Sequence, residues 1–267
     1  MQRLNDMKCL NDFMPADLHC HILPRIDDGP GHEKEAFDIL KREYQGGIRE
    51  VALTSHYDCE KTLLNDFIEK RERSFQSLKV FLKENVFTED FISMKKAAEV
   101  KFSPNLCSIN IKPLCIEGTN FMLLELPYMK PSYFDETIFH IQSCGITPII
   151  AHVERYSYMM DNPSMLYSLI DREIIIQMNA NAILNNKFKS KKYLKLIKWN
   201  LVHNLASDAH SAQRRPPNLP DAIKKVSVCL GKPVAESLCR ASHLIFNGIH
   251  PKFKPAYFPR KILGRWI

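Results

Sequence analysis

Strand-like and helix-like stretches alternate along almost the whole chain. The helical stretches between the apolar, strand-like runs include 32–45 and 191–199, and the strand-like runs are 16–22, 48–56, 92–100, 121–127, 147–153, 174–182 and 201–208. This alternation predicts βα units joined by right-handed crossovers, and therefore a parallel sheet. About seven units in one domain of roughly 250 residues favour a barrel over an open sheet.

Potential metal ligands stand in or after several of these strand-like runs. His19 and His21 are one residue apart in the first run. Because side chains alternate along a strand, both imidazoles point the same way and can reach one metal ion. Later runs place further candidates at His56, Glu99, Glu125, His152, Asp208 and His210. Since βα barrels keep their active sites at the carboxyl ends of the strands, the pattern predicts a hydrolase with a polynuclear metal centre.

The order of the motifs resembles one family of enzymes over about residues 15–250. The motifs are Asp17-Leu18-His19-Cys20-His21, Ile26-Asp27-Asp28-Gly29, Thr54-Ser55-His56-Tyr57, Leu124-Glu125-Leu126-Pro127, Ala151-His152-Val153-Glu154-Arg155-Tyr156, Ser207-Asp208-Ala209-His210 and Arg215-Pro216-Pro217. They resemble the PHP superfamily of metal-dependent phosphoesterases. Within it, they resemble the CpsB/CapC-type manganese-dependent protein tyrosine phosphatases of bacterial capsule and exopolysaccharide synthesis.

The resemblance implies a distorted TIM-like (β/α)7 PHP barrel with a three-metal site. Its residues divide into three sets: His19, His21, Glu99 and Asp208 for the first ion; Glu99, Glu125 and His152 for the second; and Asp28, His56 and His210 for the third. Glu99 would bridge two ions, and Asp27 competes with Asp28 because both lie in one turn. Independently of the resemblance, mixed imidazole and carboxylate ligands suit manganese, iron or zinc better than calcium or magnesium.

Two arginines are implied to neutralise the phosphate group of the substrate. The resemblance nominates Arg155 and Arg215, with Arg214 as the neighbouring alternative to Arg215. By the same resemblance the substrate is a phosphotyrosine protein, a membrane-associated bacterial tyrosine autokinase. A histidinol-phosphate phosphatase, another small-phosphoester hydrolase and a non-catalytic metal-binding scaffold are the alternatives, and the oligomeric state stays open.

A cysteine-dependent mechanism is the competing interpretation of Cys20. His19-Cys20 followed by Arg25 is similar to the H-C-x5-R loop of cysteine-dependent tyrosine phosphatases. Here only four residues separate Cys20 from Arg25, and none of them is glycine. We therefore interpret Cys20 as the residue between two ligands that points away from the metal site. The family usually has glycine where this chain has Arg25.

Three features of the chain predict where the protein works. The eight cysteines form no C-x-x-C pair, which is typical of reduced thiols in a cytoplasmic protein. The first sixteen residues lack an apolar signal core, and no apolar run approaches the length of about 20 residues that a membrane helix needs. We expect a cytoplasmic enzyme.

The formal net charge of +7 is concentrated near the end of the chain. Residues 251–267 carry five basic residues and no acidic one, so the charge is predicted to belong to this tail and not to a nucleic-acid-binding face. The tail either packs its aromatic side chains on the barrel, which we favour, or docks on a membrane or a membrane-bound kinase. We expect a tail at 1–15, a barrel at 16–250, the second tail at 251–267, and a hairpin around Ile109 and Ile111.

Overall fold

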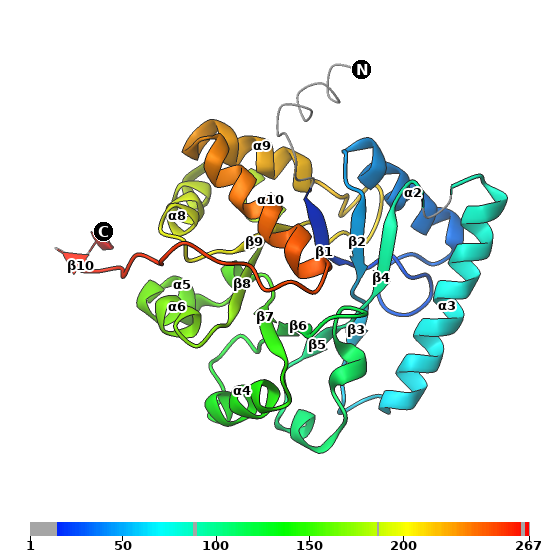
Figure 1. Cartoon of the computed structure of the whole chain (residues 1–267), viewed down its shortest axis with the longest axis horizontal. Helices are drawn as coiled ribbons and strands as arrows, with labels where there is room; N and C mark the ends of the chain where they lie inside the picture. The colour runs from blue at the N-terminus through cyan, green and yellow to red at the C-terminus, as the bar shows by residue number, and fades with distance from the viewer. Residues whose placement is uncertain (1–14, 88–89, 186, 263–264, 267) are drawn as a thin grey trace.

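A curled parallel β-sheet in two parts forms the centre of the molecule, with helices around it (Figure 1). The structure is a computed structural model that describes residues 15–87, 90–185, 187–262 and 265–266. The expected amino-terminal tail, 1–15, therefore lies outside the described residues except for its last one. None of the described helices is both long and apolar enough to cross a membrane.

Every neighbouring pair of strands in the two central sheets is parallel, as the alternation of strands and helices predicted. The smaller sheet has the order β1 (Ala16–Cys20), β2 (Glu50–Leu53) and β4 (Ser93–Lys96). The larger sheet has the order β3 (His56–Tyr57), β5 (Glu99–Lys101), β6 (Phe121–Glu125), β7 (Thr147–Ile150), β8 (Ile175–Asn179) and β9 (Asn204–Ala206).

The two sheets are linked at both edges. The predicted strands 48–56 and 92–100 each divide into two, so the chain passes from β2 to β3 and from β4 to β5. At the other edge the His21 N–H donates to the Ala209 carbonyl at 2.8 Å, and the Asp208 N–H donates to the His19 carbonyl at 2.8 Å. These bonds bring the carboxyl end of β1 beside that of β9.

Helices follow most of the strands and cover the sheet. They are α2 (Glu33–Gln45), α3 (Leu64–Glu84), α4 (Phe134–Ser143), α5 (Ser157–Met160), α6 (Pro163–Ile170), α7 (Ala180–Leu184), α8 (Lys187–Lys198), α9 (Leu219–Leu230) and α10 (Lys232–Phe246). In α10, Ile245 and Phe246 join a buried cluster with Leu18, Ile149 and Ile175 from three strands. The burial of these apolar side chains packs α10, near the end of the described chain, against β1, the first strand. It therefore holds the two ends of the fold together.

The expected hairpin around Ile109 and Ile111 is wrong. The segment forms two 3-10 helices, η1 (Pro104–Ser108) and η2 (Lys112–Leu114). Each contains a proline at its start, and proline has no N–H to donate to a strand ladder. The alternating isoleucines therefore reflect local packing, and Ile111 is buried.

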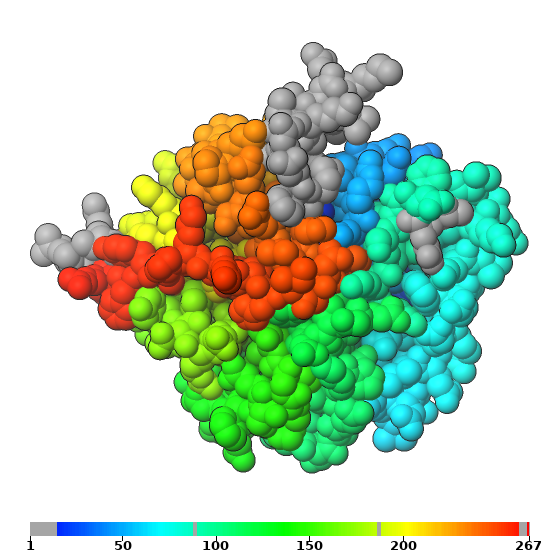
Figure 2. Space-filling view, viewed as in Figure 1, coloured from blue at the N-terminus to red at the C-terminus, as the bar shows by residue number. Residues whose placement is uncertain are grey.

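The carboxyl-terminal tail lies between α6 and α8 (Figures 1 and 2). Phe253 stacks on His203 with ring centroids 4.0 Å apart, and Tyr257 stacks on Trp199 at 5.9 Å. Phe258 meets the Tyr167 ring of α6 edge-on at 5.0 Å. The tail ends in the antiparallel pair β10 (Lys261–Ile262) and β11 (Arg265–Trp266). Its aromatic rings thus pack on the body of the protein.

Candidate metal centre

All nine residues that the sequence nominated as metal ligands lie in one cluster. Each has a ring nitrogen or carboxylate oxygen within 3.6 Å of such an atom in another member. The cluster comprises His19, His21, Asp28, His56, Glu99, Glu125, His152, Asp208 and His210. The strands position it: His19 is in β1, Glu99 begins β5, Glu125 ends β6 and Asp208 follows β9.

Glu99 occupies the middle of the cluster. Its Oε2 lies 3.3 Å from His19 Nε2, 3.2 Å from His21 Nε2 and 2.9 Å from His56 Nδ1. Its Oε1 lies 2.7 Å from His152 Nε2. Burial alone would raise the pKa of Glu99, but the surrounding histidines hold it well below its usual value. An ionised carboxylate with both oxygens among imidazoles has the chemistry of a bridging ligand.

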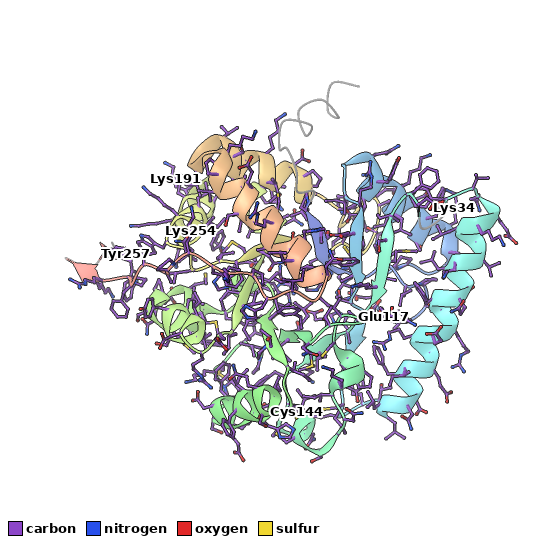
Figure 3. All side chains as sticks on the ribbon, viewed as in Figure 1. Lys34, Glu117, Cys144, Lys191, Lys254 and Tyr257 are labelled. Atoms are coloured by element: carbon purple, nitrogen blue, oxygen red, sulfur yellow. The ribbon has the colours of Figure 1, made fainter. Side chains whose placement is uncertain are left out.

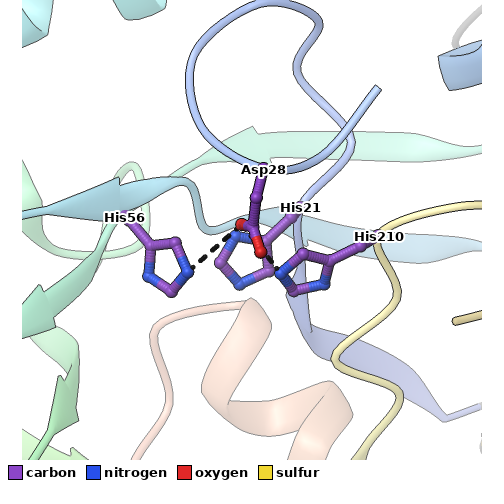
Figure 4. A group of neighbouring side chains, drawn as sticks. All are labelled: His21, Asp28, His56 and His210. Atoms are coloured by element: carbon purple, nitrogen blue, oxygen red, sulfur yellow. Dashed lines mark ion pairs between the residues drawn. The ribbon is translucent and has the colours of Figure 1, made fainter. Parts of the chain in front are cut away.

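Asp28 faces two histidines at the open side of the cluster (Figure 4). Its Oδ1 lies 3.2 Å from His210 Nε2 and 3.4 Å from His56 Nε2. The His21 ring stacks on the His210 ring with centroids 3.9 Å apart. The ligand atoms of these four residues lie within 4.8 Å of one another, so His21 joins the set that the resemblance limited to Asp28, His56 and His210.

Asp27 contacts different groups from its neighbour Asp28. Its Oδ2 lies 2.8 Å from His21 Nδ1 and accepts the His56 backbone N–H at 2.9 Å, while its Oδ1 accepts the Gly29 N–H. Burial would lower the pKa of His21, yet hydrogen bonds to Asp27 and Glu99 raise it to about 10. Asp27 therefore orients the His21 ring from behind, whereas Asp28 is the carboxylate that faces the ring nitrogens of His56 and His210.

The two carboxylate oxygens of Asp208 contact different groups. Oδ1 lies 3.4 Å from His19 Nε2, whereas Oδ2 accepts from Arg155 at 2.6 Å and from Arg215 at 2.9 Å. Burial opposes ionisation, but His19 and His21 bring the pKa of Asp208 down to about 2. Arg214 is exposed and forms no ion pair with Asp208, so Arg215 is the arginine of this pair that reaches the cluster.

Glu125 is the most loosely held of the nine. It ends β6, is 33 % exposed, and its Oε1 lies 3.6 Å from His152 Nε2. With His56 and Glu99 it forms another group whose ligand atoms lie within 4.8 Å of one another. Glu125 therefore stands on the solvent side of Glu99.

Sequence reasoning missed two residues of β8 that hold this cluster in place. Gln177 Oε1 accepts the His152 N–H at 2.8 Å and lies 3.2 Å from His19 Nδ1, and Gln177 Nε2 donates to Asn179 Oδ1 at 2.9 Å. Asn179 Nδ2 in turn donates to Asp208 Oδ2 at 2.7 Å. Because an amide oxygen only accepts, this network places the proton of His19 on Nδ1 and leaves Nε2 free to bind a metal.

The donor atoms fit divalent cations. Two ligands about 2.1 Å from one ion lie roughly 3.0–3.4 Å apart, and His19 Nε2 and His21 Nε2 are 3.1 Å apart. Gln177 and Asp27 accept at the two Nδ1 atoms, so in the neutral rings both Nε2 atoms present lone pairs, and a proton or a metal cation between them removes the repulsion. His210 Nε2 is buried and makes no hydrogen bond, although Asp28 Oδ1 lies 3.2 Å from it. These residues therefore have the chemistry and spacing of a metal centre.

Backbone conformation at the site favours particular residues. His152 and Asp208 have φ angles of 32° and 53°, in the left-handed region that side chains other than glycine rarely adopt. Arg25 has a φ of 62°, which explains why glycine suits this position. The Arg25 side chain pairs with Glu33.

Cys20 does not face the cluster. Its fully buried Sγ lies 3.5 Å from Glu43 Oε1 and 3.2 Å from Ser207 Oγ. Burial and two nearby carboxylates, of Asp17 and Glu43, raise the pKa of the thiol well above its ordinary value. A cysteine nucleophile needs an accessible thiolate. The structure therefore gives the cysteine-dependent interpretation no support.

Comparison with known proteins agrees with the motifs. A family model described as "Capsular polysaccharide synthesis, CpsB/CapC" matches residues 15–244. The chain belongs to the CpsB/CapC family. The "Tyrosine-protein phosphatase YwqE" of Bacillus subtilis is 27 % identical over 234 residues, which cover 86 % of this chain and 91 % of the relative. The "Putative tyrosine-protein phosphatase CapC" of Staphylococcus aureus is 32 % identical over 207 residues, or 75 % of this chain and 79 % of the relative.

A solved structure has the same fold. It comes from work on YwqE from Bacillus subtilis and CpsB from Streptococcus pneumoniae, described as "unique metal-dependent tyrosine phosphatases". The TM-score is 0.81 at 23 % identity, over 92 % of this chain and all of the other. This likeness supports the α/β fold with a curled parallel sheet.

Proposed function

We propose that this chain is a metal-dependent tyrosine-protein phosphatase. The observation that carries the proposal is the convergence of nine candidate ligands on one site, with Arg155 and Arg215 both bound to Asp208 at its rim. An accumulation of imidazoles and carboxylates around buried Glu99 is what a polynuclear metal hydrolase requires. The names of the curated relatives give the substrate class, phosphotyrosine on protein.

The ligand assignment follows the three groups predicted from the sequence. We propose that Glu99 is shared between ions and that His21 contributes to more than one group, because its ring lies close to both Glu99 and His210. Manganese is the proposed ion, with iron and zinc as alternatives, since all three accept mixed nitrogen and oxygen donors. When bound, such ions supply the Lewis acidity that phosphate ester hydrolysis needs.

The protein's own part in the reaction is to hold and orient the phosphate group. Arg155 and Arg215 are 35 % and 39 % exposed, so a substrate can reach their guanidinium groups. Each guanidinium can donate two parallel hydrogen bonds to phosphate oxygens. The leaving group is a phenolate whose conjugate acid has a pKa of about 10, so it needs less protonation than an alkoxide does.

We extend the proposal to the cellular location of the protein and to the type of barrel that it forms. We infer that the protein works in the cytoplasm on a membrane-associated tyrosine autokinase of capsule or exopolysaccharide synthesis. We also propose that residues 16–250 form the distorted (β/α)7 barrel of the PHP superfamily. The hydrogen bonds from His21 and Asp208 that join β1 to the end of β9 support this arrangement.

The test is hydrolysis of a phosphotyrosine peptide beside a phosphoserine peptide and histidinol phosphate, with added manganese and with a chelator. Manganese-dependent release from phosphotyrosine alone is the expected result. Replacing Arg155 by Gln should lower kcat/KM by about 10²–10³-fold, the usual effect of losing a donor to the transition state. Arg172→Gln is the matched control, since Arg172 pairs with Asp135 on the surface. Preference for histidinol phosphate, or no hydrolysis by metal-loaded protein, would refute the proposal.

A further inference from the structure

Two segments far apart in the sequence form one strongly basic face. Helix α8 (187–198) and the tail (251–267) together hold 11 of the 37 Lys and Arg residues and none of the 30 Asp and Glu residues. The remaining chain has 26 basic and 30 acidic residues, a formal net charge of −4. Assigning the positive charge to the tail alone was therefore incomplete, because α8 contributes six lysines. We call α8 and the tail the basic face.

The two segments are held side by side by hydrogen bonds. The Tyr257 N–H donates to the Trp199 carbonyl at 2.8 Å, and Asn200 Nδ2 donates to the Pro255 carbonyl at 3.0 Å. Further along, Lys195 Nζ donates to the Trp266 carbonyl at 2.5 Å. The tail is therefore fixed along α8, and its charges are added to those of the helix (Figures 1 and 2).

The basic side chains point into solvent. Among the described side chains, five lysines of α8 and four basic residues of the tail are exposed. Lys191 and Lys254, one from each segment, lie on the same side of the molecule (Figure 3). Asp161 lies at the edge of the face, 3.6 Å from Lys192. A cluster of this kind attracts an anionic surface over a distance of about 8–10 Å at ordinary salt.

Exposed aromatic side chains stand among these charges. Phe188 is 88 % exposed, and Tyr257 and Phe258 are each 49 % exposed. Lysine clusters bind anionic lipid headgroups, and aromatic rings settle at the boundary between headgroups and acyl chains. Only two of the 11 cations are arginines, the residue that recognises nucleic-acid phosphates and guanines by paired hydrogen bonds. The composition of the face therefore favours a lipid bilayer over nucleic acid.

We infer that the basic face docks the protein on an anionic phospholipid bilayer. The attraction comes from the lysines, and Phe188 inserts at the lipid boundary. The rings of Tyr257 and Phe258, which pack on Trp199 and Tyr167, contact the same boundary with their exposed halves. The tail and the metal centre lie at opposite ends of β9, because Phe253 covers His203 just before the strand and Asp208 follows it. Docking therefore leaves the metal centre accessible. The bilayer orients the molecule, because the rest of the chain is net negative and is repelled.

The experiment is sedimentation of the full chain with vesicles, which reads out binding without reference to phosphatase activity. Vesicles of phosphatidylglycerol and phosphatidylcholine in equal amounts should carry the protein down, and vesicles of phosphatidylcholine alone should not. Sodium chloride should release it, because the attraction is screened. Polyglutamate and a DNA duplex, added as competitors, distinguish a bilayer partner from other polyanions.

Two double variants with equal net charge test the location of the face. Lys191→Glu with Lys254→Glu changes the basic face, and Lys41→Glu with Lys83→Glu changes exposed positions on α2 and α3. Both lower the formal net charge from +7 to +3. Each basic residue near the bilayer contributes a factor of about five, so the loss of two should weaken binding by the first variant at least ~25-fold. The second should bind nearly as the wild type does.

Four outcomes would overturn the inference. They are equal loss in the two variants, binding to phosphatidylcholine alone, no binding to either vesicle, and complete displacement from mixed vesicles by polyglutamate or DNA at charge concentrations equal to that of the lipid. Circular dichroism melts of both variants show whether the fold is retained. A loss of binding counts only if the melting temperature of the first variant matches that of the second.

Discussion

His203 should make the protein lose stability as the pH falls below 6.5. The residue lies just before β9 and is only 4 % exposed. Its Nδ1 accepts the Ile176 N–H at 3.1 Å, its Nε2 has no hydrogen-bond partner, and its ring stacks on Phe253. Burial, helped by nearby His250, lowers the pKa of His203 to about 3. The ring therefore stays neutral in the folded protein at pH values where the unfolded chain binds a proton.

The magnitude follows from the two pKa values. Between pH 6.5 and pH 3 the unfolded chain holds one more proton at His203 than the folded chain does. The free energy of unfolding therefore decreases with a slope that approaches about 1.4 kcal/mol per pH unit in that window, or by roughly 2.3 kcal/mol from pH 6.5 to pH 4.5. The contribution is fully present from about one pH unit above 6.5.

The assay is urea unfolding of the wild type and of His203→Asn across this pH range, in the presence of a chelator. Asparagine keeps an acceptor near the Ile176 N–H but has no titratable ring. The metal-ligand side chains titrate in both proteins, so subtracting the two curves removes them. The stability advantage of the wild type over the variant should shrink by roughly 2–3 kcal/mol between pH 6.5 and pH 4.5. Parallel curves would refute the reasoning.

Three further predictions concern the candidate site. Cys20→Ser should leave kcat within a few-fold of the wild type, because the thiol is buried away from the cluster, and a dead but metal-loaded variant would contradict the metal mechanism. Gln177→Leu should weaken manganese affinity by about 10–100-fold in a direct metal titration, whereas Gln76→Leu on the exposed side of α3 should not. Tyr156→Phe removes the acceptor of the Leu126 N–H and should cost about 1–3 kcal/mol in urea unfolding; an unchanged midpoint would show that the bond contributes nothing.

The clustering of the candidate ligands was predictable because a parallel sheet brings the carboxyl ends of its strands to one edge. His19 and His21 needed only the alternation of side chains along a strand, and Asp208 and His210 needed the same spacing after the last strand. The choice between Asp27 and Asp28 was not predictable from spacing alone. It depends on the turn in which the Gly29 N–H binds Asp27 Oδ1 and directs that carboxylate behind His21.

The sequence pattern also did not predict that two of the expected strands would each divide between the two sheets. The run 48–56 contains no glycine or proline that would mark a break, yet its backbone bonds change partners at Thr54. The Thr54 N–H donates to the Cys20 carbonyl, whereas the Thr54 carbonyl accepts from Glu99. This change of hydrogen-bond partners depends on neighbouring strands that are distant in the sequence. Local apolar periodicity carries no information on it, so one predicted strand became β2 and β3.

β8 shows why the support of a metal centre is harder to predict than its ligands. A search for metal ligands does not find this strand, because its polar residues are Gln177 and Asn179 and it has no histidine or carboxylate. Amides both donate and accept, so their partners depend on what the fold places beside them. The available signal was two polar side chains at period two on an otherwise apolar buried strand. Such a pair costs stability unless it is fully hydrogen-bonded, and here its partners are His19, His152 and Asp208. A buried polar pair on a strand without ligands therefore indicates that a site lies beside it.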